Sequence, residues 1–212
     1  MIVKICGLTR PDDAAFAAGI GVDWLGLNFW PSSPRFVERV QAAEVAAAAR
    51  AARPGVLLVG IFVDQPIEEV LEVVEAIGLD YAQLHGEEPP AYVGQLGSRA
   101  LKAIPLARPG DLDRLDEYSC PAFLVDTPSP GRGGSGAVCD WELARRAAER
   151  RRVLLAGGLT PDNVGAAIAA VSPYGVDAAS GVESAPGHKE PGLVEQFVLA
   201  ARAAFERAGA GR

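Results

Sequence analysis

Short apolar runs alternate along the chain with longer segments in which apolar residues recur at helical spacing. The apolar runs predict β-strands at residues 2–5, 24–29, 56–63, 81–85, 100–104, 122–127, 153–157 and 175–180. The other segments, several of which open on Pro or acidic residues as helix starts prefer, predict helices at residues 11–19, 41–52, 66–77, 89–96, 111–116, 141–150, 162–170 and 193–207. A strand followed by a helix is therefore repeated eight times.

Several of the predicted strands are continuously apolar, which is typical of a parallel sheet covered on both faces. No linker or charge block divides the chain, so we predict a single (β/α)8 TIM-barrel domain over residues 1–212. A doubly wound open sheet is the alternative, and the absence of a G-x-G-x-x-G turn after the first strand disfavours its dinucleotide-binding form. In a barrel the active site lies at the carboxyl ends of the strands. The residues at those ends include Cys6, His85, Asp126, Gly157 and Ser180.

Charge and cysteine content limit the class of partner and the compartment. The net charge of the 212 residues is −7, which argues against nucleic acid or an anionic membrane as a partner but leaves room for a small anionic ligand. The three cysteines are far apart and form no disulfide framework, so we expect a reducing compartment. No signal-peptide core and no apolar stretch of membrane-spanning length occurs, so we expect a cytoplasmic protein. No cluster of His, Cys and carboxylates suggests a metal.

Two glycine-bearing loops follow the last two predicted strands. The seventh strand ends in "AGGLTPDNV", with Gly157 and Gly158, and the eighth in "ASGVES", with Ser180, Gly181 and Val182. Glycine lets backbone N–H groups approach an anion closely, and barrels often bind phosphate at these two loops. The alternative is that these glycines only form turns. For both loops together the pattern favours a phosphate site.

Asp126 and Cys6 are the candidates for proton transfer. Asp126 follows three apolar residues and points into the predicted barrel, where burial would raise its pKa enough for it to donate a proton. A hydrogen-bonded Asp that caps the following loop is an equally good interpretation. Cys6 shares a strand face with Lys4, whose ammonium group would favour the thiolate. An inert buried thiol is the alternative for Cys6, and it describes Cys120 better.

Three further residues have ambiguous positions. His85 ends the fourth strand, where it either contacts a ligand or, as its position slightly favours, hydrogen-bonds a loop. Arg35, in the loop after the second strand, could reach over the barrel mouth and form a bidentate pair with a carboxylate, although its position alone favours a solvated side chain. We expect Lys189 on the surface and a structural role for Cys139.

Eight segments in order resemble one known family, the phosphoribosylanthranilate isomerases of tryptophan biosynthesis. The segments are "VKICGLT", "GLNFWPSSPR", "GIFVD", "QLHGEE", "FLVDT", "GGSG…DW", "LAGGLTPDNV" and "GVDAASGVESAPGHKEPGL". They extend from residue 3 to about residue 193 and so cover nearly the whole chain. The order and spacing of the segments, rather than any one of them, make the resemblance specific.

The resemblance implies a cofactor-free barrel that carries out an Amadori rearrangement. In it N-(5-phosphoribosyl)anthranilate, an aminoaldose, becomes 1-(2-carboxyphenylamino)-1-deoxyribulose 5-phosphate. The residues at the family's positions imply Cys6 as general base and Asp126 as general acid. Such a reaction needs an acid to open the sugar ring and a base to remove the C2 proton from the resulting Schiff base.

The resemblance also implies how the substrate is held. Arg35 would bind the anthranilate carboxylate, and His85 and Asp177 would lie near the substrate. The phosphate would be bound by the two glycine-bearing loops, at Gly157, Gly158, Ser180, Gly181 and Val182. The partner is then a small phosphosugar, and both a monomer and a homodimer are compatible with the sequence.

The chain departs from the family pattern in two places. Ser135 and Cys139 stand where Thr and an aromatic residue are more usual, and His188 and Glu190 stand where the pattern tends to Lys and Asp. These departures imply an effect on binding rather than on the type of reaction. Two rival functions remain: a related isomerase of histidine biosynthesis, against which Cys6 argues because that enzyme is expected to use paired aspartates, and a non-catalytic barrel that binds a phosphorylated ligand.

Overall fold

The computed structural model describes residues 1–126 and 140–210, and within them eight parallel strands close into a barrel. Each strand pairs with the next along the chain, and the last pairs with the first. The strands are β1 (Ile2–Cys6), β2 (Trp24–Asn28), β3 (Leu57–Phe62), β4 (Tyr81–Leu84), β5 (Ala100–Pro105), β6 (Ala122–Asp126), β7 (Val153–Leu155) and β8 (Gly175–Ala178). The predicted (β/α)8 barrel is confirmed, and the doubly wound open sheet is wrong.

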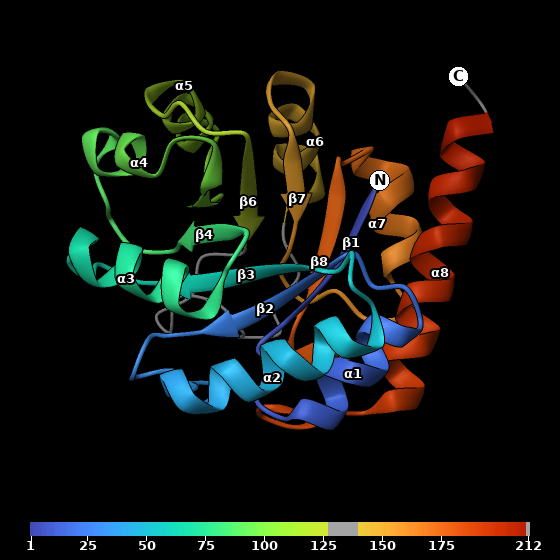
Figure 1. Cartoon of the computed structure of the whole chain (residues 1–212). Helices are drawn as coiled ribbons and strands as arrows, with labels where there is room; N and C mark the ends of the chain where they lie inside the picture. The colour runs from blue at the N-terminus through green and yellow to red at the C-terminus, as the bar shows by residue number, and fades with distance from the viewer. Residues whose placement is uncertain (127–139, 211–212) are drawn as a thin grey trace.

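Helices surround the barrel on its outside, and the long α8 runs along one side of it (Figure 1). The helices are α1 (Pro11–Gly19), α2 (Arg39–Ala52), α3 (Ile67–Ile77), α4 (Pro90–Leu96), α5 (Arg114–Glu117), α6 (Trp141–Arg150), α7 (Val164–Val171) and α8 (Pro191–Ala210). Short 3₁₀ turns occur at η1 (Gly97–Arg99), η2 (Pro109–Asp113) and η3 (Ser180–Val182). The helix predicted at residues 111–116 is thus a 3₁₀ turn followed by the single-turn α5. The antiparallel hairpin of β9 (Glu183–Ala185) and β10 (His188–Lys189) was not predicted.

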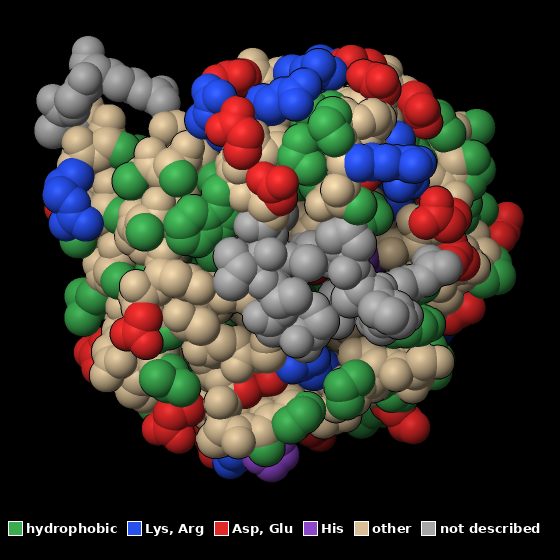
Figure 2. Space-filling view, turned by 180° about the vertical axis from the view of Figure 1, so that it is seen from behind, with side chains coloured by type: hydrophobic (Ala, Val, Ile, Leu, Met, Phe, Trp, Pro, Cys, Tyr) green, Lys and Arg blue, Asp and Glu red, His purple; other side chains and the backbone are tan. Residues whose placement is uncertain are grey.

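Charges of both signs are mixed on the face of the molecule drawn in Figure 2. Along the upper edge of the face drawn in Figure 2, Lys and Arg side chains lie next to Asp and Glu side chains rather than forming one basic patch. On α6, for example, Arg145 pairs with Glu142 at 2.8 Å and with Glu149 at 2.5 Å. Exposed pairs of this kind contribute little stability each. None of the helices in residues 1–126 and 140–210 has the length and apolar character needed to cross a membrane.

Alternation along the strands divides the buried residues into two cores. One cluster fills the space between the strands and the helices, while a second, smaller cluster lies inside the barrel. The inner cluster is Trp24, Val59, Leu101, Ala103, Ala122, Leu124, Leu154 and Ala156. The same inward-facing rows continue towards the carboxyl ends of the strands as polar residues, among them Cys6, Gln83 and Asp126. The apolar lower part of the barrel therefore supports a polar floor.

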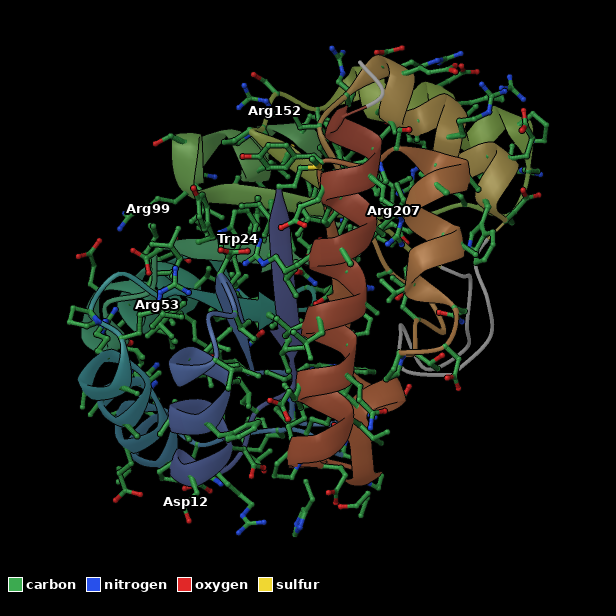
Figure 3. The ribbon with its side chains drawn as sticks, turned by 90° about the vertical axis from the view of Figure 1, so that its right-hand side faces the viewer. Asp12, Trp24, Arg53, Arg99, Arg152 and Arg207 are labelled. Atoms are coloured by element: carbon green, nitrogen blue, oxygen red, sulfur yellow. The ribbon has the colours of Figure 1, made fainter. Side chains whose placement is uncertain are left out.

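The two ends of the barrel are visible in Figure 3. Trp24 at the start of β2, Arg99 just before β5 and Arg152 just before β7 lie towards one end of the molecule. Asp12, in the first turn of α1 and so beyond the carboxyl end of β1, lies at the other. In this fold the active site forms at the end marked here by Asp12.

A buried ion pair connects β5 to the loop after β4. The ammonium group of Lys102 is fully buried and donates to the carbonyls of Leu84 (3.1 Å) and Gly86 (2.7 Å) and to the Glu88 carboxylate (3.0 Å). The Glu88 carboxylate also accepts the backbone N–H groups of Gly86 and Asp64. Because the Lys102 ammonium and the Glu88 carboxylate are both buried and hydrogen-bonded, the pair holds the end of β4 in one position.

Removal of one partner of this pair should be costly. We expect Lys102→Met to lower the free energy of unfolding in urea by about 3–5 kcal/mol, because the buried Glu88 carboxylate then has no counter-charge. The double variant Lys102→Met/Glu88→Gln should recover part of the loss. The exposed Arg145→Met is the control, with an expected loss below about 1 kcal/mol. If Lys102→Met and Arg145→Met lower the free energy of unfolding equally, the buried pair does not have this stabilising role.

Candidate active site

A cavity of about 260 Å³ opens at the carboxyl ends of the strands. It brings together side chains from β1, β2, β4, β6 and β8 and from the loop after β2. Five of the residues expected to act on a substrate line it: Cys6, Arg35, His85, Asp126 and Asp177. The parallel barrel explains this convergence, since the strand ends that carry these residues all meet at one rim.

Two glycines make room for Cys6 and for Arg35 beside it. Gly26 pairs with Cys6 across β1 and β2, and a Cβ on Gly26 would stand 2.7 Å from the Cys6 thiol sulfur. Gly7 has a positive φ of 76°, and a Cβ on it would collide with the Arg35 side chain. Neither position accepts a larger residue without displacing one of the two candidate functional groups.

A buried ion pair lies below the thiol. The Lys4 ammonium is 3.0 Å from an Asp177 carboxylate oxygen, and the two residues are direct partners in the β1–β8 register. Burial alone would lower the pKa of Lys4, but Asp177 and Cys6 outweigh it, so the pKa is raised. Lys4 is therefore a permanent positive charge next to Cys6.

The pKa of Cys6 is raised above the ordinary value of a thiol. Burial is the largest cause; the ammonium groups of Lys4 and Lys189 act in the opposite direction, while Asp177 adds to the increase. Lys4 thus favours the thiolate, as the sequence predicted, but burial outweighs it. Once formed, the thiolate is accordingly a stronger base than a free cysteine. Burial also raises the pKa of Cys120, to about 11, and that thiol hydrogen-bonds the Ala122 carbonyl.

Asp126 lies at the end of β6 and faces His85 across the cavity. Its carboxylate is 3.9 Å from Nε2 of His85, and both side chains are largely buried. Nδ1 of His85 is 3.2 Å from Nε2 of Gln83, two residues earlier on β4. Leu124 belongs to the inner cluster, so Leu124 and Asp126 point inward as predicted. The three polar side chains form a row across the cavity.

Arg35 and Lys189 meet at one carboxylate. The guanidinium group of Arg35 is 2.6–3.1 Å from both oxygens of Glu183, and the ammonium of Lys189 is 2.6 Å from the same carboxylate. Lys189 also donates to the carbonyls of Cys6 (2.6 Å) and Ala179 (3.2 Å). Burial would raise the pKa of Glu183, but the two cations outweigh it and the pKa is lowered.

Two expectations about these cations are wrong. Lys189 is 4% exposed rather than on the surface, because the hairpin of β9 and β10 turns its side chain inward to the ends of β1 and β8. Arg35 is 9% exposed and not a solvated loop residue. His188 and Glu190, on either side of Lys189, are exposed and do not line the cavity. Ser135 and Cys139 lie outside the described residues.

The two glycine-bearing loops lie against each other. Gly157 and Gly158 have positive φ angles of 87° and 61°, which favour glycine. Gly181 packs so closely on the carbonyl of Leu159 that a Cβ would collide with it. Val182 is buried, and its N–H donates to the carbonyl three residues earlier at 3.4 Å, inside the 3₁₀ turn that begins at Ser180. The loops could form a backbone cradle for an anion, with Val182 contributing the least.

Sequence reasoning missed three polar residues of the site. Asn28 ends β2 and accepts the Trp30 N–H at 2.9 Å, and Gln83 lies two residues before His85 on β4. Strand alternation could have found both. No sequence pattern pointed to Glu183, because its place beside Arg35 depends on the hairpin of β9 and β10. Among residues 1–126 and 140–210, no group of three or more His, Cys, Asp or Glu side chains could hold a metal ion.

The raised pKa of Cys6 can be measured directly. In a Cys120→Ser/Cys139→Ser background, alkylation of Cys6 by iodoacetamide should increase with pH, with a midpoint above about 8.5, the value for a free thiol. The pH must rise further before this thiol ionises, because burial disfavours the thiolate. Mass spectrometry after timed alkylation gives the rate. A midpoint at or below that of a cysteine peptide would show that the nearby ammonium groups outweigh burial.

Comparison with known proteins identifies similar chains over nearly the whole length. The sequence matches the family described as N-(5'phosphoribosyl)anthranilate (PRA) isomerase over residues 3–200. An N-(5'-phosphoribosyl)anthranilate isomerase from Rubrobacter xylanophilus is 45% identical over 205 residues, which cover 94% of this chain and 98% of the relative.

Solved structures agree with the sequence comparison. The crystal structure of phosphoribosyl anthranilate isomerase from Thermotoga maritima superimposes with a TM-score of 0.87 at 36% identity, covering 96% of this chain and 100% of that one. A phosphoribosyl anthranilate isomerase in complex with reduced 1-(o-carboxyphenylamino)-1-deoxyribulose 5-phosphate has a TM-score of 0.83 at 34% identity, with the same coverage. The similarity therefore extends to the whole barrel and not only to the segments around the cavity.

Proposed function

Because the chain belongs to the N-(5'-phosphoribosyl)anthranilate isomerase family, we propose that it converts N-(5-phosphoribosyl)anthranilate into 1-(2-carboxyphenylamino)-1-deoxyribulose 5-phosphate in L-tryptophan biosynthesis. The reaction is an Amadori rearrangement, an intramolecular aldose–ketose isomerisation. The observation that carries the proposal for the site is that Cys6 and Asp126, from β1 and β6, face one cavity. A base and an acid held on separate strands can act on the two sides of one sugar.

The proposed mechanism uses these two groups in turn. Asp126, as general acid, gives its proton to the ring oxygen, and the bond between C1 and that oxygen breaks to leave a protonated Schiff base. Cys6, as thiolate, removes the proton from C2, and the electron pair neutralises the nitrogen. The resulting enolamine becomes the ketone when C1 gains a proton and the C2 hydroxyl loses one. Each transfer is general acid–base chemistry of the kind that positioned side chains accelerate.

The environment of Cys6 supports its role as the base. The buried thiolate is a stronger base than a free one, and the charges of Lys4 and Lys189 stabilise it when it forms. Asp177 balances Lys4 in a pair that is itself buried, so the positive charge stays next to the thiol. His85, 3.9 Å from the Asp126 carboxylate, is placed to influence the acid. Each reacting group thus has an ionisable neighbour: Lys4 beside Cys6 and His85 beside Asp126.

The two anionic ends of the substrate are proposed to bind at different places around the carboxyl end of the barrel. The phosphate would occupy the corner formed by Gly157, Gly158 and Gly181, with Ser180 beside it, since backbone N–H groups and positive φ angles suit an anion there. The anthranilate carboxylate would bind Arg35, whose planar group matches a carboxylate. Glu183 already pairs with Arg35, so it both holds the guanidinium in place and competes with the substrate for it.

Four predictions from the sequence concern the partner, the location, the oligomeric state and the domain assignment. We propose a small phosphosugar as the partner. The cytoplasmic location, the choice between a monomer and a homodimer, and the assignment of residues 1–212 to one domain stay predictions. Of the two rival functions, the histidine-pathway isomerase is disfavoured because it is expected to have an aspartate where this chain has Cys6. A barrel that only binds its ligand would show no turnover.

Substitution of the acid and the base tests the proposal. Cys6→Ser and Asp126→Asn should each lower kcat by on the order of 10²-fold or more, because neither replacement transfers a proton efficiently near neutral pH. Turnover is followed by the loss of the fluorescent anthranilate conjugate. Binding of the reduced product analogue should change little, since its anionic ends are held elsewhere. If the parent protein does not convert the substrate, the proposed activity is rejected. If Cys6→Ser has the same kcat as the parent, the proposed mechanism is rejected.

The role of Arg35 has a separate test. Arg35→Lys should raise KM at least tenfold despite keeping the charge, because an ammonium cannot form the bidentate pair with the anthranilate carboxylate. Inhibition by inorganic phosphate should be unchanged. The exposed Arg39→Lys is the matched control and should behave as the parent. Unchanged kcat/KM in Arg35→Lys would assign Arg35 to the pair with Glu183 alone.

A further inference from the structure

Gln83 lines the cavity and carries a buried polar atom that has no hydrogen-bond partner among the described residues. Gln83 lies on β4, two residues before His85, and it is 1% exposed. Its amide nitrogen is 3.2 Å from Nδ1 of His85, whereas its amide oxygen is buried and has no hydrogen-bond partner among the described residues. Buried amide groups are nearly always fully hydrogen-bonded, so this oxygen requires an explanation.

The unpaired atom does not depend on how the amide is oriented. If the oxygen and nitrogen exchange places, the oxygen accepts from His85 and the nitrogen becomes the unpaired buried group. In either orientation one end of the amide contacts His85, and the other end has no partner within residues 1–126 and 140–210. A group that both donates and accepts would satisfy either arrangement.

We infer that Gln83 is a further substrate-binding residue, whose free amide end hydrogen-bonds a sugar hydroxyl of the substrate. This rests on the proposed function, in which the substrate's hydroxyl-bearing carbons lie between Cys6 and Asp126. Both of these residues line the same cavity as Gln83. The carboxylate and phosphate of the substrate are assigned to Arg35 and to the glycine-bearing loops, which leaves its uncharged groups for Gln83. Among these the hydroxyls both donate and accept, whereas the aryl amine is a poor acceptor.

The bonded end of the amide gives Gln83 a second contact with the site. When its nitrogen donates to Nδ1 of His85, the ring proton is on Nε2, which faces Asp126 at 3.9 Å. A hydroxyl bound at one end of the amide is therefore connected through His85 to the acid. This connection makes it necessary to separate direct binding by Gln83 from positioning through His85.

Replacement by an apolar residue of similar size gives the test. Gln83→Met should weaken binding of the reduced product analogue, 1-(o-carboxyphenylamino)-1-deoxyribulose 5-phosphate in reduced form, by roughly tenfold, because one hydrogen bond is lost. The melting temperature without ligand should change by no more than a few degrees, because the unpaired polar atom is removed as well. Gln83→Leu is the second variant, and Gln41→Met, whose amide donates to the Thr9 carbonyl away from the cavity, is the matched control.

A double-mutant cycle with His85→Ala decides between the two contacts. If Gln83 binds the substrate directly, Gln83→Met still weakens binding several-fold in the His85→Ala background. Loss of the effect there would overturn the inference, as would unchanged binding in both Gln83 variants at parental stability. A fall in melting temperature without a change in Kd would also overturn it. Turnover by the parent in the same preparation tests the proposed function independently.

Discussion

Pairing of β8 with β1 is the interaction on which the rest of the structure depends. Ile2 to Ile5 align with Gly175 to Ala178, and the barrel closes only because Gly175 has no side chain: a Cβ there would stand 2.8 Å from Ile2. The buried Lys4–Asp177 ion pair lies on this seam. Two buried charges are expensive to desolvate, and they are tolerated because closure brings them to 3.0 Å from each other. Lys4 lies on the same strand as Cys6, so closure gives the positive charge beside the thiol its counter-ion.

The sequence predicted the fold well because two simple signals agree. Continuously apolar strands of the right length alternate with helices, and each predicted strand lies within two residues of its observed limits, as the range 56–63 and β3 (Leu57–Phe62) illustrate. Candidates at strand ends were found for the same reason, since parallel strands of a barrel all end at one rim. The segment at residues 111–116 was harder, because a stretch of only six residues can form either a 3₁₀ turn or one turn of α-helix.

What could not be predicted depends on tertiary contacts. Lys189 looked like a surface residue between polar neighbours, and only the hairpin of β9 and β10 explains its burial. The direction of the Cys6 pKa is a balance between burial, which the sequence does not quantify, and Lys4, which it shows. Glu183 could be recognised as the partner of Arg35 only after the loops were placed. In each case the residue type was visible and its surroundings were not.

The contact between Lys189 and the Cys6 carbonyl has a consequence for the order in which the protein folds during its synthesis. The two residues are 183 positions apart, and the entropy cost of closing a loop grows with its length. Cys6 and Asp126 are both synthesised long before Lys189. A nascent chain therefore carries the proposed acid and base well before the segment that joins the ends of β1 and β8 exists. The cavity can form only after β8 and the hairpin of β9 and β10 have been synthesised. An unfinished chain therefore contains Cys6 and Asp126 but not the cavity that brings them together.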